Sequence, residues 1–152
     1  MTRKLNNYNF LIIPSIIIIV LSILPGAGSV LKEDILKSLL IERTSVLQDY
    51  YFGMVSKEET YNKLLDFETY PIITEDIESF DDHIDTDFDR VIKMSFEDIE
   101  LKSSFMGYIS YEAEIVWDMR SPEGEYRTSG RYHVVLLDEG DRIFLSKFEL
   151  IE

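Results

Sequence analysis

Three aspartates in the middle of the chain are the first residues whose spacing could do chemistry. Asp85, Asp87 and Asp89 occupy alternate positions, like the first ligands of a calcium loop, and Ca²⁺ prefers several carboxylate oxygens. The EF-hand pattern fails beyond them, because Arg90 takes the place of the turn glycine and Phe96 that of the bidentate glutamate. The three aspartates are therefore a candidate for a looser Ca²⁺ site, and no other cofactor is expected.

These aspartates belong to a longer acidic segment. From Glu75 to Asp89 the chain holds eight acidic residues and no lysine or arginine. Carboxylates so close together repel one another, so anything that neutralises them is favoured by their field. Besides calcium, the alternatives are a solvated connecting segment and a surface for a basic protein partner.

The remaining chemistry-bearing residues identify no catalytic site. The chain has no cysteine, which excludes disulfides, thiolate metal sites and a cysteine nucleophile. It contains no GxSxG, HExxH, P-loop or dinucleotide fingerprint. Its two histidines are His83 and His133, and His133 is expected on the charged face of a strand, opposite Glu112. We therefore assign no catalytic residue from the sequence.

The charge balance restricts the choice of partner. Of the 152 residues, 15 are lysine or arginine and 29 are aspartate or glutamate, which gives a net charge of −14. Binding to phosphate backbones requires a positive surface that releases counterions. A nucleic acid partner is therefore excluded, whereas a basic protein partner fits the charge.

An uncharged apolar stretch near the N-terminus predicts where in the cell the chain is located. The 22 residues from Phe10 to Leu31 carry no charge, which is long enough for a membrane helix. Arg3 and Lys4 precede the stretch and Glu33 follows it, so the N-terminus is expected in the cytosol and the rest across the membrane. The predicted organisation is a cytosolic tail (1–8), a transmembrane anchor or signal peptide (9–30) and an extracytoplasmic α+β domain (31–152).

The fate of this stretch depends on whether it is cleaved. Ala27, Gly28 and Ser29 are small residues preceded by Pro25-Gly26, as at a signal-peptidase site, and cleavage after Ser29 would secrete the domain. Small residues are also common within membrane helices. Because a helical pattern starts almost at once, at Leu31, we favour a retained anchor with the C-terminal domain outside.

Helical periodicity dominates the first half of the domain. A long amphipathic helix is predicted from ten apolar residues spaced three or four apart: Leu31, Ile35, Leu36, Leu39, Leu40, Val46, Leu47, Tyr50, Tyr51 and Met54. Ser56 and Glu59 have the spacing of a capping box and predict a second helix. After Pro71, Thr74 is expected to cap a third.

Alternating residues predict strands in the second half. Tyr108 to Met119 alternates strictly between apolar and polar residues. Ser121 to Gly124 contains a proline and a glycine, the residue types that favour a turn. The resulting hairpin register matches opposite charges on one face and apolar groups on the other. It pairs Arg120 with Glu125, Asp118 with Arg127, Glu114 with Arg131, Glu112 with His133, Trp117 with Thr128 and Ala113 with Tyr132.

Two further strands complete the predicted sheet. A three-residue turn, Glu139 to Asp141, would lead to a last strand with Tyr132 opposite Phe148 and Arg131 opposite Glu149. Before Tyr108, the apolar residues of the run 91–101 change parity, which predicts a β-bulge near Glu97 and Asp98. The expectation is therefore an α+β fold, with N-terminal helices packed on a curved four-stranded antiparallel sheet.

This order of elements over residues 31–152 resembles the NTF2-like (cystatin-like) superfamily. With the apolar stretch in front, the layout is also similar to VirB8-type secretion components. The resemblance implies a concave apolar face that can hold a small molecule, and the residues expected to line it are Tyr50, Tyr51, Tyr111, Trp117 and Tyr132. The same aromatic spacing also fits an ordinary packed core.

Three functions follow as expectations. The first is a non-enzymatic binding or assembly module of the cell envelope. The second is a small-molecule-binding protein, or an isomerase-like or cyclase-like enzyme, of the same fold. The third is an acidic immunity-type protein that blocks a basic toxin. A core filled by Tyr111, Trp117 and Tyr132 would favour the first, and an open cavity with a buried carboxylate the second.

Overall fold

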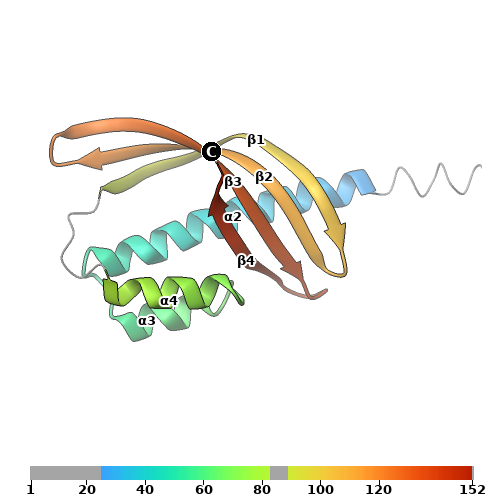
Figure 1. The fold of residues 1–152 in the computed structure, drawn as a ribbon, viewed down its shortest axis with the longest axis horizontal. Coiled ribbons are helices and arrows are strands. Elements are labelled where there is room, and N and C mark those ends of the chain that lie inside the picture. Colours follow the sequence, from blue (N-terminus) through green and yellow to red (C-terminus); the bar gives the residue numbers. More distant parts are fainter. Residues whose placement is uncertain (1–24, 83–88, 152) are drawn as a thin grey trace, which may run out of the picture. The chain divides into compact units, whose positions relative to one another are not determined.

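The computed structural model describes residues 25–82 and 89–151, with three helices followed by four strands (Figure 1). The helices are α2 (Pro25–Tyr51), α3 (Lys57–Leu64) and α4 (Ile72–Asp82), and the strands are β1 (Arg90–Phe105), β2 (Tyr108–Ser121), β3 (Gly124–Asp138) and β4 (Ile143–Leu150). The chain divides into two compact units, Met1–Asp34 and Ile35–Glu152. The predicted α+β class, with helices preceding an antiparallel sheet, is confirmed.

The predicted amphipathic helix is present as α2, but its bounds differ from those expected. It begins at Pro25 rather than Leu31. Proline suits the first turn of a helix, because a backbone N–H there has no intrahelical acceptor and its absence costs no hydrogen bond. The helix ends at Tyr51, so Met54 lies beyond it and is exposed. In the part of the chain that the structure describes, no helix is long and apolar enough to cross a membrane.

The two short helices differ in how they begin. Ser56 caps α3 as predicted, and its Oγ accepts a hydrogen bond from the Glu59 N–H at 3.2 Å. Thr74 was predicted to cap α4, but that helix already starts at Ile72, directly after Pro71. The Thr74 N–H donates to the Pro71 carbonyl at 2.9 Å, so Thr74 lies within the first turn.

The sheet is a meander in the order β1-β2-β3-β4, and the predicted register of its central hairpin is confirmed. All six predicted pairs of β2 and β3 are partners, from Arg120 with Glu125 to Glu112 with His133. The predicted bulge in β1 lies between Phe96 and Asp98, and the β1–β2 pairing shifts at two further places. Such irregularities bend a strand and increase its twist.

The predicted register of β3 and β4 is wrong by two residues. Phe148 pairs with Val134 rather than Tyr132, and Glu149 pairs with His133 rather than Arg131. Four residues separate the two strands instead of three, and the pairing shifts once more after Val135. Because a shift of two preserves the side of the sheet, Phe148 still lies on the same face as Tyr132. Their rings stack, with centroids 4.6 Å apart.

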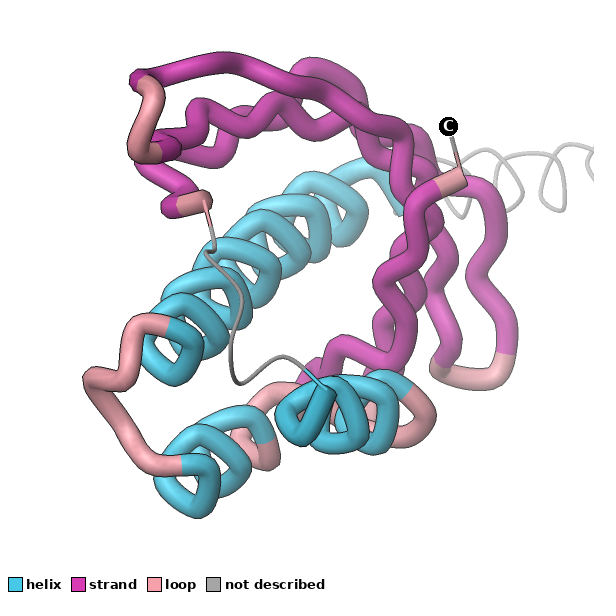
Figure 2. Tube along the Cα trace, turned by 60° about the vertical axis from the view of Figure 1, so that its left-hand side comes forward, coloured by secondary structure: helices cyan, strands magenta, loops and turns pink. Residues whose placement is uncertain are grey.

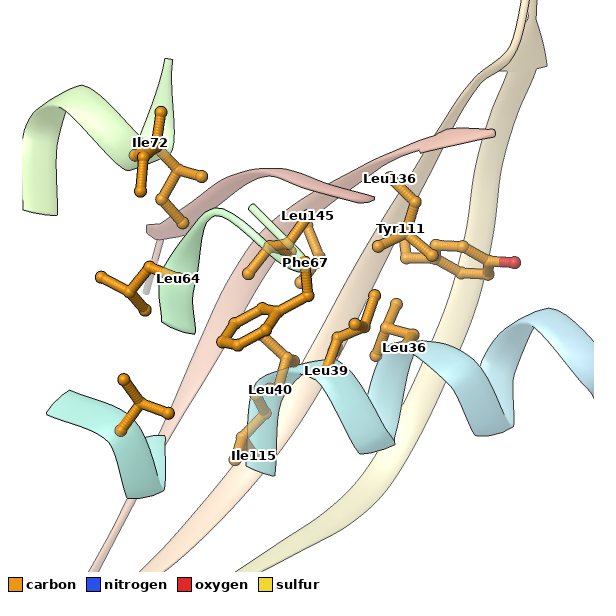
Figure 3. Packing of buried hydrophobic residues seen from close by; sticks show 14 of the residues in the cluster. Leu36, Leu39, Leu40, Leu64, Phe67, Ile72, Tyr111, Ile115, Leu136 and Leu145 are labelled. Carbon is orange, nitrogen blue, oxygen red and sulfur yellow. The ribbon is translucent and has the colours of Figure 1, made fainter. Parts of the chain in front are cut away.

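The core of the second unit lies between α2 and the inner face of the curved sheet (Figure 2). Leu36, Leu39 and Leu40 of α2 pack with Tyr111 and Ile115 of β2, and with residues of β3, β4 and the short helices (Figure 3). The segment after α3 joins the sheet through a parallel bridge between Glu68 and Leu145. This bridge brings an acidic residue into the core.

Candidate functional site

The most distinctive group in the core is a cluster of one arginine and two acids, Arg43, Glu68 and Asp76. Arg43 lies on α2, Asp76 on α4, and Glu68 in the segment between α3 and α4. The Arg43 guanidinium donates to Asp76 through Nε, at 3.0 Å from Oδ2, and through Nη2, at 2.5 Å from Oδ1. Its Nε also lies 3.0 Å from Oε1 of Glu68. One cation therefore serves two carboxyl groups that are distant in the sequence.

Glu68 is the least satisfied member of this cluster. Its side chain has no exposed surface, and within the described residues neither carboxyl oxygen has a hydrogen-bond partner of good geometry. The Arg43 Nε is at ion-pair distance from it, but its hydrogen is directed to Asp76. An ionised carboxylate in this position would be costly in free energy, because burial removes its hydrating water and the surrounding groups do not replace all of the lost hydrogen bonds.

The protonation of Glu68 follows from these surroundings. Burial, as the largest cause, and the nearby charge of Asp76 together raise the pKa of Glu68 from 4.5 to about 8, against the opposing effect of Arg43. At neutral pH Glu68 is therefore mainly a neutral carboxylic acid, and the cluster balances one cation with one anion. A neutral acid at pH 7 can act as a proton donor, which is the chemistry of many catalytic carboxyl groups.

A chain of aromatic rings extends from this cluster into the sheet. The Arg43 guanidinium lies 5.4 Å from the centroid of the Phe148 ring, which stacks on Tyr132. The Tyr132 hydroxyl accepts a hydrogen bond from Trp117 Nε1 at 3.1 Å. The rings of Trp117 and Tyr132 meet edge to face, with centroids 6.0 Å apart. The inner face of the sheet is thus occupied by packed aromatic side chains.

A second aromatic group joins the C-terminal part of α2 to α4. The Tyr50 ring packs on Phe80 with a centroid distance of 4.3 Å, and its hydroxyl donates to the Phe80 carbonyl at 3.2 Å. Tyr51 contacts the same ring edge to face, and its hydroxyl lies 3.2 Å from the Ser79 hydroxyl. This group fixes α4 against α2.

The five residues predicted to line a ligand pocket therefore occupy three places. Tyr50 and Tyr51 contact Phe80, whereas Trp117 and Tyr132 contact each other. Tyr111 lies in the core with 1% of its surface exposed, beside Leu36 (Figure 3). The side chains fill space between helices and sheet, and their ligand-binding role stays a prediction.

The structure describes only part of the predicted calcium site. Asp85 and Asp87, like His83, lie outside the described residues. Asp89 accepts a hydrogen bond from the Tyr126 hydroxyl at 2.5 Å, which ties the start of β1 to β3. Within residues 25–82 and 89–151, no group of three or more histidine, aspartate or glutamate side chains is placed to hold a metal ion.

His133 lies where the sequence placed it, on the charged side of the sheet. It pairs with Glu112 on β2 and with Glu149 on β4. Its Nε2 lies 2.8 Å from the Ser110 hydroxyl. These neighbours are those of a cross-strand polar ladder, and such ladders support sheet pairing.

Sequence reasoning missed the Arg43–Glu68–Asp76 cluster altogether. Arg43 lies on the apolar face of its helix, four residues after Leu39 and three before Val46, and this position was a signal of burial that the sequence reading did not use. Asp76 was assigned to the acidic segment. Glu68 is a single acid in a short connection, with no pattern that signals burial. The local hint for Glu68 was its apolar surroundings, Leu64, Leu65 and Phe67.

The comparisons with known proteins add no relative. No protein-family model, no curated protein and no solved structure matches this chain. The functional argument therefore depends on the residues and their geometry.

Proposed function

We propose that this chain is a non-enzymatic binding or assembly module of the cell envelope, anchored in the membrane through residues 9–30, with residues 31–152 outside the cytosol. The observation that carries this proposal is the filled interior. Tyr111 is buried, Trp117 is hydrogen-bonded to Tyr132, and Tyr132 is stacked on Phe148. A protein with its interior packed in this way binds through its outer surface.

The course of α2 supports a retained anchor. The helix runs without interruption from Pro25 to Tyr51 and includes Ala27, Gly28 and Ser29. Cleavage after Ser29 would remove its first residues. The arrangement of helices and curved antiparallel sheet is compatible with an NTF2-like domain, and we assign the chain to that fold as part of the proposal.

Fractionation of cells that express the full chain tests the anchor. We expect the protein in the membrane fraction after a high-salt or carbonate wash, with an intact N-terminus by mass spectrometry. A soluble product that begins at Val30 would show cleavage and overturn the anchor. Protease added to intact cells should digest the C-terminal domain, because it is expected outside the cytosol.

Glu68 favours a second candidate function, an isomerase-like or cyclase-like enzyme. A buried carboxyl group with a pKa of about 8 has the protonation of a general acid at neutral pH. The side chain has no exposed surface, so a substrate could reach it only if the core opened. A screen of apolar small molecules by thermal shift separates the two functions. A compound that stabilises the wild type, and Glu68→Gln less, would favour the second function, a small-molecule-binding protein or enzyme, and turnover of that compound would then identify an enzyme.

A further inference from the structure

The end of the β1–β2 hairpin exposes three large apolar side chains to solvent. Phe105 pairs with Tyr108 where the two strands end, and Met106 and Gly107 form the loop between them. The exposed fractions are 74% for Phe105, 81% for Met106 and 51% for Tyr108. No residue from 103 to 111 is charged. We call the four residues of this loop and its closing pair the apolar tip.

The loop conformation makes Met106 an unexpected residue for the fold. Its φ is 50° and that of Gly107 is 84°, so both loop residues lie in the left-handed region, as in a type I′ turn. Asparagine or aspartate is favoured before the glycine of such a turn, whereas a long apolar side chain is sterically disfavoured there. Because Met106 is so exposed, packing within the domain does not offset this disadvantage. Contact with an apolar environment outside the chain would explain the methionine.

The apolar tip lies at the end of the sheet where α2 enters the second unit. Near the C-terminal end of α2, the Gln48 side chain accepts a hydrogen bond from the Val91 N–H at the start of β1, at 2.8 Å. Near the beginning of the unit, Leu36 lies beside Tyr111 of β2 (Figure 3). Tyr111 is three residues, or about 10 Å of strand, from Tyr108. The chain therefore enters the unit and forms the apolar tip at the same end.

The proposed anchor holds this end of the unit close to the membrane. The uncharged stretch that includes the anchor ends at Leu31, five residues before Leu36. Five residues span at most about 18 Å in any conformation, so Leu36 stays near the membrane surface. The apolar tip lies at the same end and is within reach of that surface. The polar β2–β3 loop, residues 121–124, lies at the opposite end of β2.

The charges beside the apolar tip indicate which lipid surface it fits. Lys102 forms ion pairs with Glu100 at 2.7 Å and with Glu112 at 3.0 Å, so its charge is already neutralised. On the other side, the backbone N–H of Asp138 donates to the Gly107 carbonyl at 2.8 Å, which places an acidic residue next to the loop. Attraction to anionic lipids depends on basic residues near the surface. The apolar tip therefore fits a bilayer of zwitterionic lipids.

We propose that the apolar tip inserts into the surface of the membrane that holds the anchor. Phe105 and Met106 enter the boundary between headgroups and acyl chains, and Tyr108 lies at the headgroup level, which suits its amphipathic ring. The loop backbone stays in the hydrated headgroup region, where water satisfies its polar groups. This second contact fixes the orientation of the domain against the membrane. The inference rests on the proposed anchor and adds a lipid-binding site to it.

A single fluorescent label tests the insertion, because the chain has no cysteine of its own. An environment-sensitive dye is attached to Met106→Cys or, as the matched control, to Glu123→Cys at the exposed polar loop of the other hairpin. The full chain is reconstituted into phosphatidylcholine vesicles, with and without a lipid that carries a spin-label quencher near its headgroup. Flotation of the vesicles on a density gradient reports separately whether the chain is anchored.

The two labels separate the possible environments of the apolar tip. We expect a blue shift and loss of emission to the lipid quencher at position 106, and neither effect at position 123. A blue shift at position 106 without lipid quenching would show contact with protein and overturn the proposal. Emission at position 106 like that at position 123 would show a solvent-exposed tip and also overturn it. A wild-type chain that does not float with the vesicles would refute the anchor, and the inference with it, whereas a floating chain with an unquenched tip refutes the inference alone.

A redesigned tip separates membrane contact from folding. Met106→Asn creates the Asn-Gly sequence that type I′ turns favour, so it should raise the melting temperature of the full chain in detergent. Combined with Phe105→Ser, it removes two of the three apolar side chains. A dye on Ser104→Cys, beside the tip, should be quenched by lipid in the otherwise wild-type chain and should lose this quenching in the double variant. Equal quenching in both would overturn the proposal.

Discussion

The guanidinium of Arg43 approaches Glu68 to 3.0 Å, yet its hydrogen bonds are aligned on Asp76. This leaves the Glu68 carboxyl group buried beside a cation without good hydrogen bonds. A buried carboxyl group of this kind is better accommodated as the neutral acid. The cluster therefore couples the packing of α2 and α4 to the protonation of a single side chain.

The first prediction is that the domain loses stability as the pH rises. The pKa of Glu68 is about 8 in the folded protein and 4.5 as the ordinary value, so the folded state holds the proton more tightly. The contribution of Glu68 to the free energy of unfolding is complete below pH 4.5 and is lost progressively up to about pH 8. The loss is on the order of a few kcal/mol. Arg43 from α2 and Asp76 from α4 are the charged groups that face Glu68.

The variant Glu68→Gln isolates this effect from the other carboxylates. Glutamine is nearly isosteric and neutral at every pH, so its melting temperature should exceed that of the wild type at pH 8.5. The difference should shrink or reverse at pH 5. Thermal unfolding between these values by circular dichroism provides the measurement. A difference independent of pH would mean that Glu68 does not change its protonation in this range.

The second prediction concerns Arg43. Arg43→Met keeps much of the side-chain volume but leaves Asp76 and Glu68 without their shared cation. Removing one partner of a buried ion pair typically costs about 3–5 kcal/mol, and we expect a loss of that order in the free energy of unfolding. Urea titration measures it. Adding Asp76→Asn to Arg43→Met should recover part of the loss, and an additive further loss would contradict the cluster.

The sequence was most informative where neighbouring strands share one alternating pattern. In the β2–β3 hairpin, opposite charges pair on one face and apolar groups on the other. A slip of one residue in register would have placed charged side chains opposite apolar ones. The β3–β4 register failed because it depends on one extra loop residue and on an irregularity after Val135. No residue type marks either feature.

The candidate site was not predictable from local pattern. Arg43 and Asp76 are 33 residues apart, and the cluster forms only after α2, α4 and the segment at Glu68 have packed together. Periodicity assigns a residue to a face of one element, but it does not show which faces of different elements meet. The aromatic residues had the same difficulty: their types were noted, but Tyr50 and Trp117 belong to different groups.

The third prediction uses the only tryptophan of the chain as a reporter. Tyr132→Phe removes the hydroxyl that accepts the hydrogen bond of Trp117 Nε1. We expect a loss of about 1 kcal/mol in stability and an upfield shift of the indole N–H proton in the NMR spectrum. Tyr126→Phe is the matched control, because its hydroxyl bonds to Asp89 instead. An indole resonance unmoved by Tyr132→Phe would refute the contact.

The fourth prediction tests the charged face of the hairpin. Asp118 accepts a hydrogen bond from Arg127 Nε at 2.7 Å, which lowers the pKa of Asp118. The pair is exposed, so Asp118→Arg should change the melting temperature only slightly. The swapped double variant, Asp118→Arg with Arg127→Asp, should restore the wild-type value at low salt. Failure of the swap, with both single changes harmful, would argue against this register.

The last prediction concerns calcium and the acidic segment from Glu75 to Asp89. Two of its carboxylates already have partners, since Asp76 binds Arg43 and Asp89 accepts the Tyr126 hydroxyl. A specific Ca²⁺ site would add RT ln(1 + [L]/Kd) to stability, whereas simple screening would follow ionic strength whatever the cation. We expect equal melting temperatures in millimolar CaCl₂ and in NaCl of matched ionic strength. A rise seen only with Ca²⁺, and lost in Asp87→Asn, would instead establish the metal site, because a screening effect would survive the removal of one carboxylate.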